Sequence, residues 1–212
     1  MPMKLILRLS FLLLMITVPS LAQEQKMTDS EAAVFRQNVG SVAKRIKSLT
    51  TDFTQYKHMD FLAKDIETSG RMSFKEPSML QWQYLKPYNY SIVFKKGKIL
   101  INDEGRKSQM DAGSSKIFAK LNKLIVGSVS GDMFDDDEFV ITYFKTKTQN
   151  IARLVPKDPA LKKYLKQVEL SFDPADAMVT QVRLIETAED FTRIVFRNKK
   201  INVPISDAVF SN

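Results

Sequence analysis

The sequence predicts a mainly β fold with helices, of the α+β class, in which about eleven short strands form a mostly antiparallel sheet that tends to curl. Three observations predict it. After Leu49, apolar residues recur with a period of two over many short segments. Residues typical of tight turns separate these segments. Two further segments carry helical periodicity instead.

We interpret residues 1–22 as a secretory signal peptide, because Lys4 and Arg8 precede an apolar run at 9–18 and small residues follow it. The run is too short to span a membrane. We therefore expect an exported, soluble chain, with a single mature domain at 23–212 located in the periplasm. The sequence contains no cysteine, which excludes disulfides and a lipid anchor attached through an N-terminal cysteine.

The mature chain is basic. Cleavage near Ala22 and Gln23 removes two of the 32 basic residues and none of the 24 acidic ones, so the mature net charge is about +6. Export argues against a nucleic-acid partner. An anionic membrane surface or an acidic protein face fits this charge, and a charge that serves only solubility remains an equal alternative.

Thr28 and Glu31 begin the first predicted helix. Their spacing fits a capping box, in which the hydroxyl and the carboxylate each satisfy a free backbone N–H group. Apolar residues then recur at spacings of three and four, which predicts a helix over 29–48 with one apolar face that must pack on another element. These residues are Ala32, Phe35, Val39, Val42, Ile46 and Leu49.

Short strands with clear turns between them follow this helix. Gly97 and Gly105 mark two turns, and the segments 173–176 and 188–190 supply turn residues between the last strands. The segment 158–165 predicts one or two helical turns. The eleven strands are predicted at 51–58, 65–74, 78–86, 90–94, 98–102, 106–110, 138–144, 150–155, 166–172, 178–186 and 191–197.

A second amphipathic helix is predicted at 115–126, inserted within the sheet. Its lysines lie off the apolar stripe, and Gly113 and Gly127 flank it. The stripe consists of Ile117, Phe118, Leu121, Leu124 and Ile125.

The sequence offers little for catalysis. His58 is the only histidine, so neither a multi-histidine metal site nor a histidine-paired nucleophile can form, and a structural role for it is favoured. The acidic segment 132–139 lacks the glycine and the ligand spacing of a calcium-binding EF-hand loop, which favours a solvated loop. The sequence leaves open acid–base catalysis by a pair of carboxylates that meet across the sheet. We expect a protein that is not an enzyme and has no cofactor or metal.

Several segments, in order along nearly the whole mature chain, resemble the periplasmic outer-membrane lipoprotein carrier (LolA) family. They are DFTQ (52–55), SGRMSF (69–74), EPSMLQWQYLKP (76–87), SIVFKKGKIL (91–100) and RLVPK (153–157).

The resemblance implies an unclosed antiparallel β-barrel of eleven strands with a helical lid over a hydrophobic cavity. It also implies the partners. Carriers of this family accept acylated lipoproteins from an inner-membrane ABC transporter and pass them to an outer-membrane lipoprotein receptor. We expect this chain to do so as a monomer.

Glu76 departs from the family pattern. Relatives place an arginine at this position, where it is thought to lock the lid by donating hydrogen bonds, and a carboxylate has no hydrogen to donate. This departure leaves open a second function on the same fold, as a carrier or sensor of another lipid or acyl product.

A sheet that curls without closing has a concave face that must be covered. The two predicted helices are the covers, and the apolar alternation supplies the candidate lining of a lipid-binding cavity. The alternative that these side chains simply fill a β core fits the alternation equally well, and the family resemblance favours the cavity. The predicted lining is Phe53, Met72, Phe74, Leu80, Trp82, Tyr84, Ile92 and Phe94.

Overall fold

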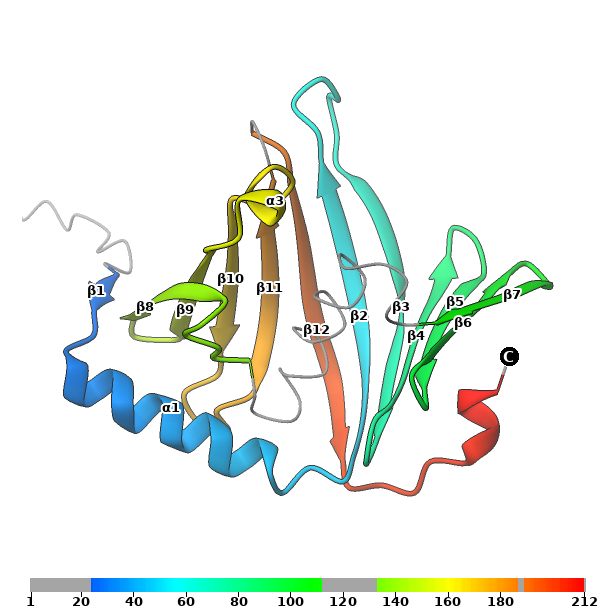
Figure 1. Ribbon diagram of the computed structural model, residues 1–212, viewed down its shortest axis with the longest axis horizontal. Coiled ribbons are helices and arrows are strands. Elements are labelled where there is room, and N and C mark those ends of the chain that lie inside the picture. Colours follow the sequence, from blue (N-terminus) through cyan, green and yellow to red (C-terminus); the bar gives the residue numbers. More distant parts are fainter. Residues whose placement is uncertain (1–23, 112–132, 187–188, 212) are drawn as a thin grey trace, which may run out of the picture.

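The computed structural model describes residues 24–111, 133–186 and 189–211, and these form one large antiparallel sheet of twelve strands (Figure 1). The strands are β1 (Gln25–Lys26), β2 (Ser48–His58), β3 (Ile66–Lys75), β4 (Met79–Lys86), β5 (Tyr90–Lys95), β6 (Lys98–Asp103), β7 (Arg106–Asp111), β8 (Phe139–Lys145), β9 (Asn150–Pro156), β10 (Gln167–Phe172), β11 (Val179–Ile185) and β12 (Phe191–Ile201). The helices are α1 (Asp29–Ala43), α3 (Pro159–Lys162) and the 3₁₀ helix η2 (Asp207–Phe210).

The sheet is unclosed. Its order is β1-β8-β9-β10-β11-β12-β2-β3-β4-β5-β6-β7, and within the described residues the end strands β1 and β7 do not pair with each other. The central pair, β12 and β2, joins two series of consecutive strands, with Phe196 opposite Phe53. Strands far apart in the sequence therefore form one continuous interior face (Figure 1).

All eleven predicted strands are present as β2 to β12. The twelfth, β1, has two residues and is too short for a sequence period to reveal. It pairs with β8 through Gln25 opposite Lys145 and Lys26 opposite Phe144. The prediction of one or two helical turns at 158–165 is confirmed by α3, where Oδ1 of Asp158 accepts the N–H of Ala160 at 2.8 Å.

The predicted capping box is confirmed at the start of α1. Oγ1 of Thr28 accepts the backbone N–H of Glu31 at 3.3 Å, and Oε2 of Glu31 accepts the backbone N–H of Thr28 at 3.0 Å. The predicted end of the helix is wrong, because α1 stops at Ala43 and not near Ser48. Ile46 is buried in the connection between α1 and β2, so the spacing of apolar residues continues through a turn that is not helical.

Helix α1 packs on the β8–β10 side of the sheet. The ring of Phe35 meets Phe172 edge-on at 5.1 Å between centroids, and Tyr143 at 5.8 Å. Val39 is buried in the same apolar cluster, which we call the α1 cluster. Its buried members are Met27, Phe35, Val39, Met133, Phe139, Tyr143, Ala152, Leu154, Leu161, Leu165, Val168, Leu170 and Phe172.

A second apolar cluster, here called the Trp82 cluster, lies mainly on the interior face of β2 to β6 and extends to β12, to the β10–β11 turn and to the connection between α1 and β2. Its buried members are Ile46, Leu49, Phe53, Met72, Phe74, Leu80, Trp82, Phe94, Ile99, Met178 and Ile194. Its partly buried members are Val42, Tyr84, Ile92, Ile101, Val182 and Phe196.

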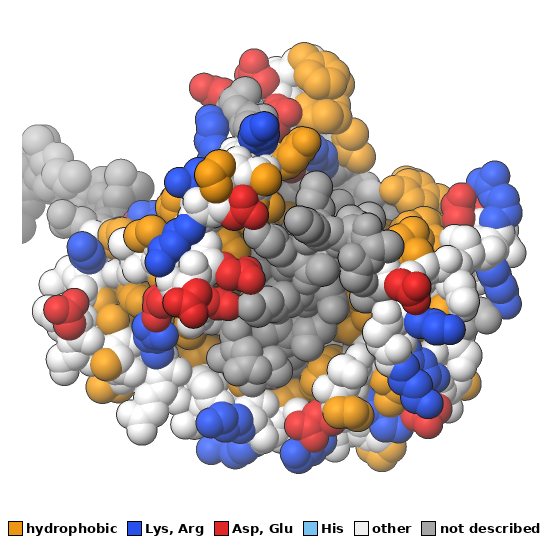
Figure 2. All heavy atoms as spheres, viewed as in Figure 1, with side chains coloured by type: hydrophobic (Ala, Val, Ile, Leu, Met, Phe, Trp, Pro, Cys, Tyr) orange, Lys and Arg blue, Asp and Glu red, His pale blue; other side chains and the backbone are white. Residues whose placement is uncertain are grey.

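The hairpin of β2 and β3 protrudes from the sheet at the top of Figure 1. Phe61, in its connecting loop, is 79% exposed, and Ile66 at the start of β3 is also exposed. Figure 2 shows hydrophobic side chains at the surface of this tip.

Two predicted segments, the signal peptide at 1–22 and the lid helix at 115–126, lie outside the described residues. No helix in 24–111, 133–186 or 189–211 is long and apolar enough to cross a membrane.

Candidate functional site

The structure brings all eight predicted lining residues together in the Trp82 cluster. Six of them are buried, whereas Tyr84 and Ile92 are partly buried. Their role in binding a lipid stays a prediction, since side chains gathered in this way also form an ordinary core.

The register of the strands explains why these residues meet. Across β3 and β4, Met72 lies opposite Trp82 and Phe74 opposite Leu80. Across β4 and β5, Trp82 lies opposite Ile92, and Leu80 opposite Phe94. Directly opposed residues of an antiparallel pair point to the same face. The alternation predicted from the sequence therefore becomes one apolar surface.

Aromatic rings form the centre of this surface. The ring of Phe53 stacks on Trp82 with 4.2 Å between centroids and an interplanar angle of 28°. Tyr84 meets Phe53 edge-on at 5.3 Å. The hydroxyl of Tyr84 donates to Oε1 of Gln55 at 3.1 Å, and burial raises the pKa of Tyr84. At neutral pH this tyrosine is thus an uncharged, mostly apolar part of the interior.

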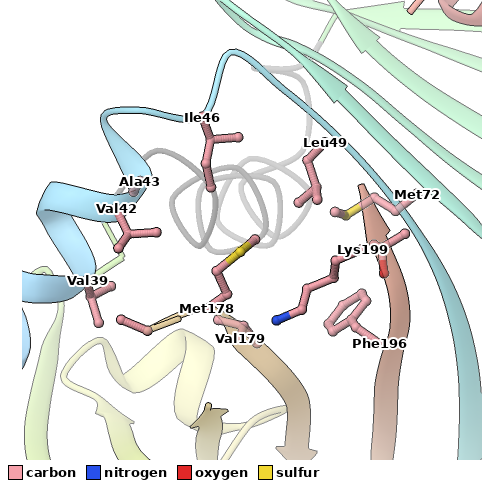
Figure 3. A pocket seen from close by; sticks show the side chains of 12 residues that line it. Val39, Val42, Ala43, Ile46, Leu49, Met72, Met178, Val179, Phe196 and Lys199 are labelled. Carbon is pink, nitrogen blue, oxygen red and sulfur yellow. The ribbon is translucent and has the colours of Figure 1, made fainter. Parts of the chain in front are cut away.

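A pocket adjoins the Trp82 cluster, between α1 and the strands β2, β3, β11 and β12 (Figure 3). Its cavity volume is only about 30 Å³. The pocket is thus narrow, and an acyl chain enters it only if side chains move. Its lining is Val39, Val42, Ala43, Ile46, Leu49, Thr51, Met72, Ala177, Met178, Val179, Phe196 and Lys199.

Met72 is the one predicted lining residue that also lines this pocket. Sequence reasoning placed Val42 and Ile46 on a covering helix but did not place Met178, Phe196 or Lys199 in the interior. The missing information is long-range, because β12 lies beside β2 through a pairing that no local pattern reveals.

Among the described residues that line the pocket, Lys199 has the charged side chain. Its Nζ lies 2.9 Å from Oδ2 of Asp176, which belongs to the turn between β10 and β11. The side chain of Lys199 is 18% exposed, and that of Asp176 is 42% exposed. The ion pair therefore lies at the mouth of an otherwise mostly apolar pocket.

Glu76, predicted at the lid-locking position, lies between β3 and β4 and contacts Lys47. Oε2 of Glu76 lies 2.8 Å from Nζ of Lys47, and the backbone N–H of Glu76 donates to the carbonyl of Lys47 at 2.9 Å. These contacts tie the β3–β4 turn to the connection between α1 and β2. The lid residues Ile117, Phe118, Leu121, Leu124 and Ile125 lie outside the described residues, so the locking role stays a prediction.

The side chains weighed for chemistry have structural contacts. Nδ1 of His58 lies 2.9 Å from Oδ1 of Asp65 across the β2–β3 hairpin, and its ring stacks on Phe191 at 4.7 Å. In the acidic segment, Oδ1 of Asp135 accepts the backbone N–H groups of Asp137 and Glu138. The part of the chain that the structure describes holds no group of three or more His, Cys, Asp or Glu residues suited to a metal ion.

Comparison with known proteins relates this architecture to lipoprotein carriers. The family model described as outer membrane lipoprotein carrier protein LolA matches residues 44–212. An outer-membrane lipoprotein carrier protein of Francisella tularensis is 24% identical over 177 residues, covering 79% of this chain and 78% of the relative. A protein of the same name from Methylococcus capsulatus is 26% identical over 170 residues, covering 77% of this chain and 76% of the relative.

The solved structure of MucB shows a similar fold at low sequence identity. The crystal structure of MucB aligns with a TM-score of 0.53 and 12% identity, covering 86% of this chain and 63% of MucB. A LolA superfamily protein from Nitrosomonas europaea aligns with a TM-score of 0.46 and 7% identity, covering 85% of this chain and 97% of that protein.

Proposed function

Because the chain belongs to the outer membrane lipoprotein carrier (LolA) family, we propose that it is a periplasmic carrier that binds the acyl chains of lipoproteins and moves them from the inner to the outer membrane. In this proposal residues 1–22 direct export. The donor is an inner-membrane ABC transporter, and the acceptor is an outer-membrane lipoprotein receptor. Binding and release need no covalent step, and the proposed role is not enzymatic.

The observation that carries the proposal is the Trp82 cluster on the interior face of an unclosed sheet. A sixteen-carbon acyl chain costs about 12 kcal/mol in water, at roughly 0.8 kcal/mol per methylene. Binding in the apolar interior offsets part of this cost, because contacts between the acyl chain and the interior replace contacts between protein side chains. Met72 and Met178 suit such an exchange, because an unbranched thioether repacks around different shapes.

A second candidate function is a carrier or sensor of another lipid or acyl product. Glu76 favours it, because this carboxylate pairs with Lys47 instead of supplying the hydrogen-bond donors of the family's arginine. The two candidates share the apolar interior and differ in the molecule that occupies it.

Mass spectrometry of molecules that co-purify with the periplasmic protein tests the proposal. We expect acylated lipoproteins with the wild-type chain and their loss in Leu80→Glu, because Leu80 is fully buried at the centre of the cluster. Leu85→Glu is the matched control, since Leu85 is on the same strand and is 49% exposed. Tyr84→Glu is a second variant, chosen because Tyr84 is only partly buried and a carboxylate there can reach water.

The outcomes separate the two functions. Co-purification of lipoproteins with the wild type and with Leu85→Glu, but not with Leu80→Glu or Tyr84→Glu, supports a carrier of lipoproteins. Co-purification of lipids without lipoproteins supports the second candidate. Equal recovery with all variants, or no acylated molecule with any of them, contradicts both, provided that circular dichroism shows the variants folded.

A further inference from the structure

A β-bulge in β12 turns Lys199 into the interior. Arg197 lies opposite Asp52 and Lys200 opposite Thr50, so that Asn198 and Lys199 together face the single residue between them on β2. Without the bulge, the alternation of β12 would direct residue 198 inward and residue 199 outward. Instead Lys199 lines the pocket beside Phe196 (Figure 3).

Three features hold the bulge in place. Asn198 adopts a positive φ of 56°, in the left-handed region that asparagine tolerates. Its Nδ2 donates to Oδ2 of Asp52 at 2.9 Å on the outer face. Oγ1 of Thr51, a buried pocket residue, donates to the carbonyl of Arg197 at 2.7 Å. The inward direction of Lys199 is thus built into the local structure.

The described residues surround the Lys199 side chain mainly with apolar groups. Figure 3 shows the Lys199 side chain extended among Met178, Val179 and Phe196. Within the described residues, its hydrogen-bond acceptor is Oδ2 of Asp176, whereas an ammonium can donate three hydrogen bonds. The other carboxylate oxygen of Asp176 accepts the backbone N–H of Met178 at 2.8 Å, so the turn keeps Asp176 at the mouth.

A cation at the mouth of a narrow apolar pocket complements an amphiphile with a negative head and an apolar tail. Met72 lines this pocket and belongs to the Trp82 cluster, so an acyl chain with its head at Lys199 would extend among apolar side chains of the interior once these side chains move. The ligand's anion would take the place that Asp176 holds, and this exchange keeps the ammonium paired throughout.

We propose that the pocket beneath α1 binds acyl chains that carry an anionic head, a carboxylate or a phosphate, and that Lys199 selects for this head by exchanging Asp176 for it. The proposal rests on the second candidate function, a carrier or sensor of another lipid or acyl product, because the acyl chains of a lipoprotein are held in ester or amide bonds and end in no anionic group.

Displacement of the neutral dye Nile red from the full mature chain tests it at about pH 8, where a fatty carboxylate is ionised. The competitors are laurate, dodecyl phosphate, dodecanol and inorganic phosphate. We expect laurate and dodecyl phosphate to bind about tenfold more tightly than dodecanol. A hydrogen bond to a charged group contributes a free energy that corresponds to about a tenfold change in affinity. Inorganic phosphate should not displace the dye.

The variants isolate the role of Lys199. Lys199→Met should bring the ratio of laurate affinity to dodecanol affinity close to one, and Lys199→Arg should keep the wild-type ratio. Asp176→Asn should raise laurate affinity about threefold, because the competing carboxylate is gone while an oxygen remains for the N–H of Met178. The measurement on Asp176→Asn also tests the proposal if Lys199→Met does not fold.

Two kinds of failure are distinguishable. If the wild type binds laurate and dodecanol equally, or if Asp176→Asn leaves their ratio unchanged, Lys199 does not select the head and the inference is overturned while acyl binding stands. Displacement by inorganic phosphate alone also overturns it, because the anion would then bind without a chain. If none of the acyl competitors displaces Nile red, both the inference about Lys199 and the proposed function are contradicted.

Discussion

Phe53 on β2 faces Gly70 on β3, and its ring occupies space that a side chain at residue 70 would need. A Cβ atom there would lie 2.7 Å from Cζ of Phe53 and 1.9 Å from the backbone oxygen of Gln83 on β4. The absence of a side chain at Gly70 thus allows the close approach of the strands next to the stacked pair of Phe53 and Trp82. One glycine supports the aromatic centre of the interior.

We expect Gly70→Ala to lower the free energy of unfolding by about 2–3 kcal/mol. The added methyl group overlaps the backbone of Gln83, which cannot move aside as the end of a flexible side chain can. Urea denaturation measures this. Gly40→Ala in α1 is the control, since nothing lies within 4 Å of its added Cβ and alanine favours a helix by about 1 kcal/mol. A neutral effect of Gly70→Ala would contradict the close approach.

Phe53 and Phe61 form a second matched pair, because one phenylalanine is 2% exposed and the other 79%. We expect Phe53→Ala to lower the free energy of unfolding by about 3–5 kcal/mol, since it removes a buried ring from the aromatic centre. Phe61→Ala should change it by less than about 0.5 kcal/mol. Thermal and urea unfolding of both variants check this, and similar losses would show that the hairpin tip is packed in solution.

Local patterns predicted most of the fold. The alternation of apolar and polar residues is local, and it located most of the strands from β2 to β12 because they have one face in the interior, whereas β7 is exposed along its whole length. The capping box at Thr28 is local as well. The end of α1 was missed because Ile46 is buried from a turn, and burial at helical spacing does not require helical backbone. The motifs in order along the chain also identified the family that the comparisons confirm.

The sequence revealed less of the pocket, for two physical reasons. The pairing of β12 with β2 brings Phe196 beside Met72, and such pairing depends on contacts between distant segments. The bulge at Asn198 shifts the alternation by one residue, so a regular strand predicts the wrong side of the sheet for Lys199. Alternation describes the interior only where the strand is regular.

Acid should destabilise the start of α1. Hydrogen bonds from the ammonium of Lys145 and from the backbone of Thr28 lower the pKa of Glu31 below its ordinary value of 4.5. A group whose pKa is lower in the folded state stabilises the fold above its unfolded pKa and loses this contribution as the pH falls through the folded value. We expect the melting temperature to decrease as the pH falls below about 4.5, and to do so less steeply in Glu31→Gln.

Glu31→Gln suits this measurement because glutamine also completes a capping box, so the helix start is retained without the charge. Lys145→Met removes the largest cause of the lowered pKa and should flatten the same part of the profile. Parallel profiles for the wild type and both variants would show that Glu31 does not contribute to the acid sensitivity.

The ion pair of Glu76 and Lys47 joins the β3–β4 turn to the connection between α1 and β2. Their side chains are 41% and 67% exposed, so Glu76→Arg should lower the free energy of unfolding by at most about 1 kcal/mol. If this contact also restrains α1 over the interior, Glu76→Arg and Lys47→Glu should each speed the uptake of Nile red, because like charges then separate the two connections. The double variant, which restores an opposite pair, should return uptake towards the wild-type rate. Stopped-flow fluorescence of the four proteins measures this, and identical uptake rates would limit the pair to a small effect on stability.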